Sequence, residues 1–493
     1  MEVVLTDVDL YYRALQSRDS RFDGWFYTAV TSTGVYCRPS CPAVTPKRSN
    51  VRFFRSAAAA QSAGFRACKR CRPDATPGSP DWNIRADLVG RAMRLISDGV
   101  VDREGVSGLA RRLGFSERHL HRQLVAEVGA GPIAVARAQR AQTARVLLET
   151  TDLPITDVAF AAGFASVRQF NDTVREVFSV TPSELRRTAQ PATAGTPSPG
   201  TISVRLPFRR PIDLDAVFAF LAARAVPGVE EFAGDTFRRT LALPHGTGVV
   251  ELSAGPPGAR YLRCVLRLSD VRDLPAASQR CRRLLDLDAD PQAVDEALGA
   301  DPVLGPLVAG SPGRRVPGHV DGAELAVRAV LGQQVSVPAA RTLAARLVRR
   351  YGAPLATPSG SLTHLFPSPA ALAEADLADV GLPGSRRRAL AALSLALAGG
   401  QLAVDPGADR AELHARLLEL PGVGAWTASY IGMRALGDPD VFLPSDAGVR
   451  HALTRLGLPT DPTFAARLAD QWRPWRSYAL FHLWGTLRSE QRS

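Results

Sequence analysis

Lysine is almost absent from this sequence: among 493 residues, only Lys47 and Lys69 are lysines. Arginine therefore supplies nearly all of the positive charge, and because it stays protonated it cannot act as an amine nucleophile. Chemistry that needs a lysine amine is thus excluded from residues 70–493. The net charge of +12 and the isoelectric point near 10.0 still indicate a polyanionic partner.

The sequence also lacks a targeting signal and a membrane span. Its first residues, MEVVLTDVDLYYRAL, carry acidic side chains where a signal peptide would be basic, and no apolar run is long enough to cross a bilayer. Six cysteines are too few for a disulfide-rich secreted scaffold. We therefore expect a cytoplasmic protein in which clustered cysteines bind metal.

Composition divides the chain into several parts. Residues 189–200 (AQPATAGTPSPG) contain no charge and no large apolar side chain, which is typical of a linker, and a weaker break falls at 72–82. Within the C-terminal part, apolar periodicity predicts short strands with helices over residues 201–283 and helices nearly throughout from about residue 284 onward. The expected parts are a cysteine-bearing head (1–78), a helical segment (84–188), the linker (189–200), a strand-and-helix segment (201–283) and a helical core (284–493).

The head contains two closely spaced cysteine pairs. Cys37 and Cys41 form C-x3-C, and Cys68 and Cys71 form C-x2-C. Two such pairs can close a tetrahedral site of four thiolates, which is a ligand set that zinc prefers. Spacing alone is more typical of a zinc site that only stabilises a small domain. One Zn²⁺ with four thiolates would carry a net charge of −2.

The residues around the cysteines add a specific resemblance. GVYCRPSCPA and GFRACKRCRP make the head similar to the N-terminal domain of the Ada family of methyl-transfer regulators. The resemblance implies that Cys37 attacks the methyl group of a methylated DNA phosphate while the other three cysteines complete the site. Arg38, Lys69, Arg70 and Arg72 flank the motif and could contact DNA phosphates, although each could also be a solvated surface charge.

Methylation of Cys37 would change the charge of the zinc site from −2 to −1. One unit of charge removed about 8 Å from a DNA phosphate is worth roughly 2 kcal/mol at an effective dielectric constant near 20. This corresponds to more than a tenfold change in affinity from one phosphate. We therefore expect the methylated head to bind DNA more tightly and to act as a damage sensor.

Two helix-turn-helix patterns follow, at 106–129 and 155–178. Gly114 and Gly163 occupy the turns, where glycine permits a sharp angle. The pair, with FSVTPSELRR after it, resembles the AraC-type DNA-binding domain, although a plain helical bundle is the alternative. If the protein activates transcription, RNA polymerase is an expected partner. We expect the protein itself to be a monomer. The side chains expected to enter the major groove are Arg118, His119, Arg122, Arg168, Gln169 and Asn171.

The C-terminal part contains the segments FLAARAVPGVE, VRAVLGQQVSV, LELPGVGAWTASYI, DVFLPSDAGVR and WRPWRSYALFHLW. These segments make it similar to AlkA-type DNA glycosylases rather than to an O6-alkylguanine transferase. No PCHR motif occurs, and Cys264 and Cys281 are expected to be packed thiols. In the helix-hairpin-helix pattern LPGVG, Gly422 and Gly424 let backbone N–H groups approach a DNA phosphate.

Asp446 is the catalytic candidate that this resemblance implies. Cleavage of an N-glycosidic bond builds positive charge on the deoxyribose, which a carboxylate stabilises; the alternative role is a helix N-cap. Trp426, Tyr430 and Trp484 match aromatic pocket positions of the family, although each could be ordinary core. Their faces would attract a cationic alkylated base.

Three positions depart from the usual AlkA pattern. Ser445 stands where a second aspartate is common, and Ala447 stands where a tyrosine is common. The sequence therefore does not define which alkylated bases are excised. Gln334 occupies the place of the leucine wedge that fills the gap left by the flipped base.

The lysine of bifunctional relatives is replaced by Trp426, which predicts a monofunctional glycosylase.

The sequence therefore predicts a multidomain α+β protein. Its parts are a small α/β zinc domain, an all-α double helix-turn-helix, a small antiparallel TBP-like sheet with helices and an all-α helix-hairpin-helix core. The expected function is sensing and repair of alkylated double-stranded DNA, with excision of 3-methyladenine- and 7-methylguanine-type bases and activation of repair genes. The alternative is a DNA-binding regulator whose glycosylase-like part only adds affinity.

Overall fold

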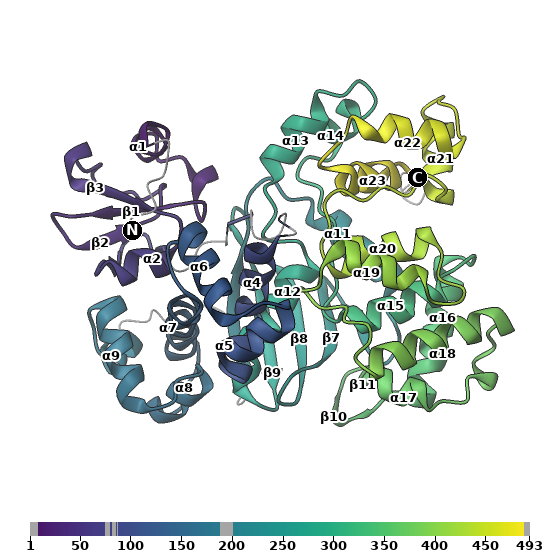
Figure 1. Cartoon of the computed structure of the whole chain (residues 1–493), viewed down its shortest axis with the longest axis horizontal. Helices are drawn as coiled ribbons and strands as arrows, with labels where there is room; N and C mark the ends of the chain where they lie inside the picture. Colours follow the sequence, from purple (N-terminus) through teal and green to yellow (C-terminus); the bar gives the residue numbers. More distant parts are fainter. Residues whose placement is uncertain (1–7, 74–78, 81–84, 86, 188–200, 488–493) are drawn as a thin grey trace. The chain divides into compact units, whose positions relative to one another are not determined.

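The computed structural model describes residues 8–73, 79–80, 85, 87–187 and 201–487 (Figure 1). The predicted linker at 189–200 and most of the weaker break at 72–82 lie outside the described residues. The chain divides into two compact units, which are considered separately. Unit 1 comprises residues 1–208, 243–248 and 257–279, and unit 2 comprises residues 209–242, 249–256 and 280–493.

The head is a small α/β domain, as predicted. Its sheet has the order β3-β1-β2-β4; β1 pairs antiparallel with β2 and β3, and β2 pairs parallel with β4. Phe26 is fully buried and contacts the rings of Tyr11 and Phe53, so aromatic side chains form much of this core. The elements are α1 (Val8–Gln16), β1 (Tyr27–Val30), β2 (Val35–Cys37), β3 (Val51–Phe54), α2 (Ala57–Ser62) and β4 (Arg66–Ala67).

The helical segment contains the two predicted helix-turn-helix units. Gly114 (φ 78°) and Gly163 (φ 86°) occupy the turns in the left-handed region, which favours glycine. Ser116 and Ser166 cap the following helices, since their hydroxyls accept hydrogen bonds from the N–H groups three residues on. The helices are α4 (Leu88–Ser97), α5 (Val100–Leu113), α6 (Glu117–Val128), α7 (Pro132–Thr150), α8 (Ile155–Ala161), α9 (Val167–Phe178) and α10 (Pro182–Arg187).

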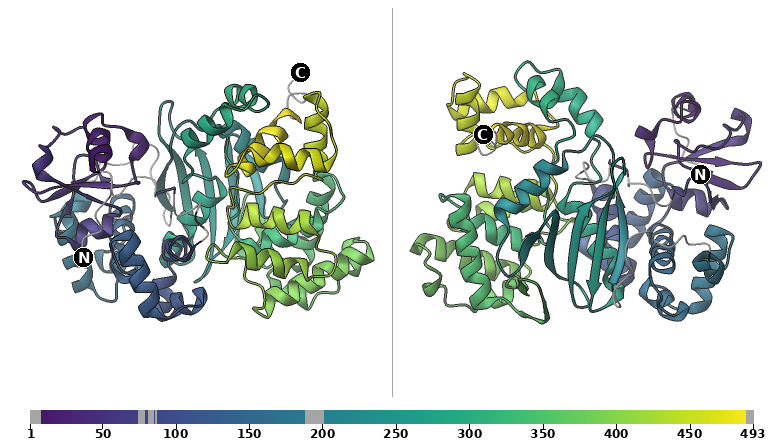
Figure 2. Two further views of the ribbon diagram at one scale, coloured as in Figure 1. Left: turned by 45° about the horizontal axis from the view of Figure 1, so that its top comes forward. Right: turned by 180° about the vertical axis from the view of Figure 1, so that it is seen from behind.

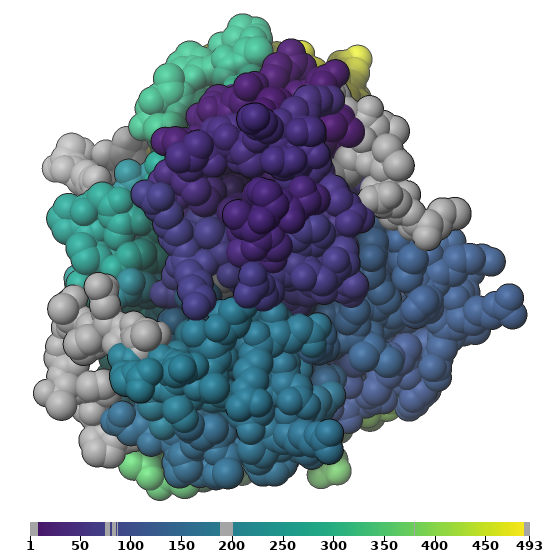
Figure 3. All heavy atoms as spheres, turned by 90° about the vertical axis from the view of Figure 1, so that its left-hand side faces the viewer, coloured from purple at the N-terminus to yellow at the C-terminus, as the bar shows by residue number. Residues whose placement is uncertain are grey.

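Hydrogen bonds inside unit 1 connect the head with these helices. Ser56 Oγ donates to the Val128 carbonyl (3.0 Å), and Arg66 Nη1 donates to Ser179 Oγ (2.8 Å). Figure 3 shows the head in purple and the helical segment in blue. The metal-binding candidate and the DNA-binding candidate are thus parts of one compact unit.

A five-stranded sheet of order β5-β9-β8-β7-β6 follows, and its strands lie side by side in the right-hand view of Figure 2. β5 pairs antiparallel with β9, and β6 pairs antiparallel with β7. In β9, Leu262, Cys264 and Leu266 alternate into the core, as the apolar alternation predicted. The elements are β5 (Thr201–Pro207), α11 (Leu214–Arg224), β6 (Glu230–Ala233), β7 (Thr236–Ala242), β8 (Thr247–Ala254), β9 (Tyr261–Leu268) and α12 (Leu274–Leu284).

The C-terminal core is mostly helical, as expected. One departure is the hairpin of β10 (Pro354–Ser359) and β11 (Leu362–His364), where Gly360 (φ 66°) forms the turn in a Pro/Ser/Thr-rich segment with little helical periodicity. The helices are α13 (Pro291–Gly299), α14 (Gly305–Gly310), α15 (Gly322–Leu331), α16 (Val337–Tyr351), α17 (Pro369–Ala373), α18 (Gly384–Ala398), α19 (Arg410–Leu418), α20 (Ala425–Ala435), α21 (Ala447–Arg455), α22 (Pro462–Asp470) and α23 (Arg476–Gly485). Among the described residues, no helix is both long and apolar enough to span a membrane.

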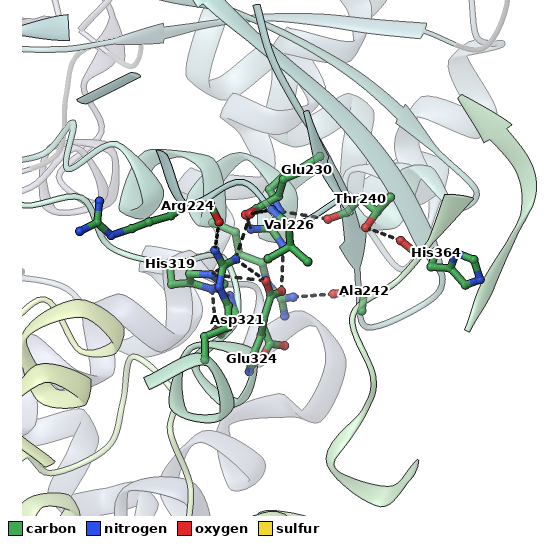
Figure 4. A network of polar contacts seen from close by, with 12 residues as sticks. Arg224, Val226, Glu230, Thr240, Ala242, His319, Asp321, Glu324 and His364 are labelled. Carbon is green, nitrogen blue, oxygen red and sulfur yellow. Dashed lines mark hydrogen bonds and ion pairs between the residues drawn. The ribbon is translucent and has the colours of Figure 1, made fainter. Parts of the chain in front are cut away.

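A buried charge network fixes α15 to strands β6 and β7 within unit 2 (Figure 4). Arg239 contacts Glu230 and Glu324, both at 2.8 Å, and Arg328 contacts the same two carboxylates, both at 3.0 Å. His319 also lies beside Glu324 (3.5 Å). Although these carboxylates and the imidazole are close enough to share a metal, the two guanidinium groups already balance the two carboxylates, so this cluster needs no cation.

Candidate functional sites

The parallel pairing of β2 with β4 brings the two cysteine pairs together. Tyr36 is in register with Ala67, so Cys37, the last residue of β2, and Cys68, which directly follows β4, lie side by side. Cys41 and Cys71 complete the group. The four sulfur atoms lie within 4.8 Å of one another, and all four side chains are buried.

The donor set fits a divalent metal. Hydrogen bonding with Cys41 and Cys71, together with burial, raises the pKa of the Cys37 thiol, whereas the hydrogen bonds that Cys41 accepts from Cys37 and Cys71 lower the pKa of Cys41. A cation such as Zn²⁺ would hold all four cysteines deprotonated, and the four-sulfur geometry is the one that zinc adopts in proteins.

Asp23 is a component of this site that the sequence analysis did not identify. Its buried carboxylate accepts hydrogen bonds from Ser40 N (3.0 Å) and Ser40 Oγ (2.6 Å) and lies 3.5 Å from Arg38 Nη1. Asp23 thus fixes the loop that joins Cys37 to Cys41. No sequence motif marks it, since the contact is made by the folding of the chain.

The basic side chains around the cysteines differ in their surroundings. Lys69 and Arg70 are exposed, whereas Arg38 is half-buried beside Asp23. Arg72 has a left-handed backbone (φ 49°) and donates to Glu149 of α7 at 2.5 Å. The structure therefore pairs Arg72 with a carboxylate inside unit 1, although the sequence analysis considered it for a DNA phosphate.

The helix-turn-helix candidates lie on the two expected helices. On α6, Arg118 and Arg122 are exposed, and His119 stacks on Phe115 with ring centroids 5.1 Å apart. Arg122 Nη2 also lies 3.2 Å from His119 Nδ1. These three predicted residues therefore share one surface of α6.

On α9 the three candidates are less alike. The Arg168 side chain is 93% exposed and weakly paired with Asp172 at 3.9 Å. Gln169 is exposed, but its side-chain carbonyl accepts a hydrogen bond from Ala165 N (3.3 Å). Asn171 is half-buried. Arg168 is therefore the candidate on α9 that extends furthest into solvent.

Asp446 caps the N-terminus of α21 and is held by three donors. Its Oδ1 accepts hydrogen bonds from Val449 N (3.1 Å) and Trp484 Nε1 (2.9 Å). Its Oδ2 accepts a hydrogen bond from Trp426 Nε1 (3.0 Å). The same Asp446 side chain can therefore act both as the helix cap and as the carboxylate of the site, which were the two roles considered from the sequence.

Two of the three predicted aromatic residues contact this carboxylate, and the third stacks on one of them. Trp426 and Tyr430 of α20 stack with centroids 5.1 Å apart and planes 7° from parallel, and Trp484 comes from α23. The Tyr430 hydroxyl accepts a hydrogen bond from Arg434 Nη1 (2.7 Å). Burial raises the pKa of Tyr430, but the positive charges of Arg434, Arg224 and Arg328 outweigh burial and lower it.

The hairpin at 420–424 lies directly before α20. Gly422 has φ 78°, and a Cβ there would lie 2.9 Å from Ala389 Cβ, so both conformation and space require glycine. Gly424 is the N-cap residue of α20 and is exposed, with open space where a Cβ would be. Both glycines therefore leave the hairpin backbone accessible.

The predicted wedge segment is attached to this hairpin. Gln333 Nε2 donates to the Gly422 carbonyl (2.9 Å) and to Thr427 Oγ1 (3.0 Å). Gln334 is exposed and has φ 53°, an unusual conformation for a non-glycine residue. The sequence analysis singled out Gln334 but not Gln333, whose role depends on contacts with residues distant in the chain.

Family models match four stretches of the chain. The matches are to the metal binding domain of Ada (residues 10–74), a helix-turn-helix domain (109–188), the AlkA N-terminal domain (203–321) and the HhH-GPD superfamily base excision DNA repair protein (327–477).

Similar proteins agree with these matches. The chain is 58% identical to the "probable bifunctional transcriptional activator/DNA repair enzyme AlkA" of Mycobacterium tuberculosis H37Rv, over 98% of this chain and 97% of the relative. It is 38% identical to the "DNA-3-methyladenine glycosylase 2" of Escherichia coli K12, over 57% of this chain and 96% of the relative. A 3-methyladenine DNA-glycosylase structure from Archaeoglobus fulgidus matches 59% of this chain and 100% of its own, with a TM-score of 0.51 and 22% identity, a likeness of fold alone. The chain therefore belongs to the family of bifunctional AlkA proteins, which join an Ada-type zinc domain and a helix-turn-helix domain to an AlkA-type glycosylase.

Proposed function

We propose that this protein senses and repairs alkylated DNA, with the head (1–78) as methyl acceptor, the helices at 84–188 as promoter-binding domain and residues 201–283 and 284–493 as glycosylase. The observation that carries the proposal is the Asp446 carboxylate, held by two indole N–H groups beside an accessible helix-hairpin-helix. A part that only added DNA affinity would not need an oriented carboxylate. The regulator-only alternative is therefore less well supported.

The proposed reaction of the glycosylase is hydrolysis of the bond between an alkylated base and deoxyribose. As the base leaves, positive charge develops on the sugar, and Asp446 stabilises this charge or orients the attacking water. The faces of Trp426, Tyr430 and Trp484 would attract a cationic base. Gly422 and Gly424 would contact a phosphate, and Gln334 would fill the gap in the duplex. The products are a free base and an unbroken strand with an abasic site.

The proposed reaction of the head is a single methyl transfer. The Cys37 thiolate attacks the methyl carbon of a phosphate triester; a sulfur–carbon bond forms, the carbon–oxygen bond breaks and the phosphodiester anion leaves. One zinc ion held by Cys37, Cys41, Cys68 and Cys71 would keep the sulfurs deprotonated at neutral pH. The exposed side chains of Lys69 and Arg70 would contact neighbouring phosphates.

Methylation would then strengthen DNA binding, because the head loses one negative charge. The helix-turn-helix side chains Arg118, His119, Arg122, Arg168, Gln169 and Asn171 would read the promoter. RNA polymerase would be the partner of the activated protein, and the active form would be a monomer.

One incubation tests both activities. Purified protein is mixed with methylated duplex DNA; the released bases are identified, and the mass of each cysteine peptide is measured. We expect free alkylated purines and about 14 Da, one methyl group, on the Cys37 peptide. Release of no base would favour the regulator-only alternative. A methyl group on another cysteine would refute the role of Cys37.

The charge switch is tested by DNA affinity before and after methylation. Affinity should rise at least tenfold at low salt, and the gain should shrink as salt increases. An unchanged affinity would show that the methylated head does not act through its charge.

A further inference from the structure

The two indole groups at Asp446 use their only polar atoms on this carboxylate. Each tryptophan has a single N–H donor. Trp484 donates to Oδ1 at 2.9 Å and Trp426 to Oδ2 at 3.0 Å, from helices α23 and α20 respectively. Together with Val449 N, these donors occupy three of the four lone-pair directions of the carboxylate. The carboxylate is therefore held from both of its oxygens and cannot rotate freely.

Gly448 provides the space for this arrangement. A Cβ at this position would lie 2.9 Å from Asp446 Oδ1 and 2.9 Å from both Nε1 and Cδ1 of Trp484. Gly448 does not have a positive φ, so glycine is needed there for space rather than for backbone conformation. Any side chain at this position would press on the hydrogen bond between Trp484 and Asp446.

A wall that only stacks a base would not require these hydrogen bonds. One face of Trp426 already stacks on Tyr430, and the ring of Trp484 packs against Phe481 at 5.1 Å. The nitrogen-bearing edges of both indoles meet the carboxylate instead. The sequence analysis considered these tryptophans only as pocket walls or core, and neither reading accounts for the two N–H contacts.

We propose that Trp426, Trp484 and Gly448 are positioning residues of the glycosylase site. The two indole N–H groups fix the Asp446 carboxylate in the orientation that faces the developing positive charge on the sugar, and Gly448 keeps the space for one of them. This inference rests on the proposed function, because it assigns these residues a role in base excision. A preorganised carboxylate stabilises the transition state without reorganising during the reaction.

The test replaces each tryptophan with phenylalanine, which keeps an aromatic face and removes the donor. The variants are Trp426→Phe, Trp484→Phe and Gly448→Ala in the full chain. Gly432→Ala in α20 is the matched control, since no atom lies within 4 Å of the Cβ it would add. Single-turnover base release is measured together with the affinity for two abasic duplexes, one with a cationic pyrrolidine sugar analogue and one with a neutral tetrahydrofuran.

We expect the single-turnover rate to fall ten- to a hundredfold in the three variants, with the affinity for the neutral abasic duplex changed less than threefold. The preference for the cationic over the neutral analogue should fall by a similar factor, because the carboxylate no longer faces the charge. Gly432→Ala should match the wild type in both measurements. The neutral analogue reports DNA binding by folded protein, so a loss of folding would lower both affinities and leave their ratio unchanged.

If both Trp→Phe variants bind the neutral analogue as tightly as the wild type and keep its preference for the cationic analogue, the inference is overturned, whatever happens to the rate. A wild-type protein that neither releases bases nor prefers the cationic analogue would instead refute the proposed glycosylase. The two failures are therefore distinguishable.

Discussion

At the scale of single residues, Asp446 combines a structural and a proposed catalytic role. Its side chain caps α21 through Val449 N and also receives the two indole donors. A cap needs only one acceptor oxygen, whereas this carboxylate uses both oxygens. The second oxygen is thus the part of the residue that the cap does not explain.

Asp446→Asn separates these roles. The amide oxygen can still accept the hydrogen bond of the cap, but the negative charge is lost and one indole N–H faces an NH₂ group. We expect base release to fall at least about a hundredfold, as for removal of one electrostatic stabiliser, while undamaged duplex binding stays within twofold. Single-turnover release and duplex titration measure the two quantities. Base release at the wild-type rate would rule out Asp446 as the catalytic carboxylate.

His482 is a second residue whose burial has a measurable consequence. It lies in α23, and burial together with the positive charge of Arg314 lowers its pKa to about 3. Its unfolded pKa is near 6.5, so between these values only the unfolded chain binds the proton. Its contribution to stability is therefore present above about pH 7 and is lost as pH falls toward 3. Linkage gives a loss of about 1.4 kcal/mol between pH 7.5 and 5.5.

His482→Gln should remove this part of the pH dependence. Urea unfolding of wild type and variant is followed by tryptophan fluorescence at pH 7.5 and 5.5, since four of the six tryptophans lie between residues 426 and 484. The stability difference between the two proteins should shift by about 1.4 kcal/mol in favour of the variant at the lower pH. Groups common to both proteins, including the buried His319, cancel in this comparison. If the free energy of unfolding changed equally with pH in the two proteins, the lowered pKa of His482 would be contradicted.

At the scale of elements, sequence patterns predicted the structure wherever the pattern depends on residues that are close together in the sequence. The cysteine spacing, the two turn glycines and the alternation in β9 all predicted the structure that is found. Residues whose roles depend on distant partners were not predictable. Asp23 lies outside the quoted motifs, and the quoted segments that contain Gln333 and Gly448 do not reveal their roles, because each of the three contacts a group that folding brings near.

The hairpin β10–β11, which lies among helices, was also not predicted from the sequence. Its segment PLATPSGSLTH has no 3.6-residue periodicity, and two short strands give too weak an alternation to stand out among helices. Arg72 illustrates the limit for charge: its neighbours in the sequence suggested a phosphate contact, whereas its partner in the fold is Glu149, far along the chain. Charge patterns locate basic residues but not their partners.

The head is the element whose stability should depend most on metal. Its core is small, and four of its buried side chains are the clustered cysteines. Cys68→Ala removes one ligand of the proposed zinc site, so zinc should be lost and the head should unfold. The glycosylase residues lie in unit 2, so base release should remain within about twofold of wild type. Metal analysis, proteolysis of the head and a base-release assay measure these outcomes. Full zinc occupancy in the variant would contradict the four-thiolate site.

At the scale of the whole molecule, the two proposed reactions share one substrate class but differ in what they consume. Methyl transfer uses up Cys37 once, whereas base excision regenerates Asp446 after each turnover. A chain with both can continue to excise bases after its sensor has reacted. The proposed zinc site belongs to unit 1, and Asp446 with its two indole donors belongs to unit 2, so the reacting groups of the two proposed reactions come from different units.

The scarcity of lysine allows a decisive test on the intact chain. Bifunctional glycosylases attack the sugar with a lysine amine and form a Schiff base, which borohydride reduces to a stable covalent adduct. Here the position of that lysine is Trp426, residues 70–493 contain no lysine, and arginine stays protonated. We therefore expect water to be the nucleophile and the strand to remain unbroken after the base is released. Incubation with a single-lesion duplex and borohydride should give no adduct to residues 201–493, and alkali should be needed to break the strand at the abasic site. Trapping of a glycosylase peptide would show that another amine attacks the sugar and would refute a monofunctional mechanism.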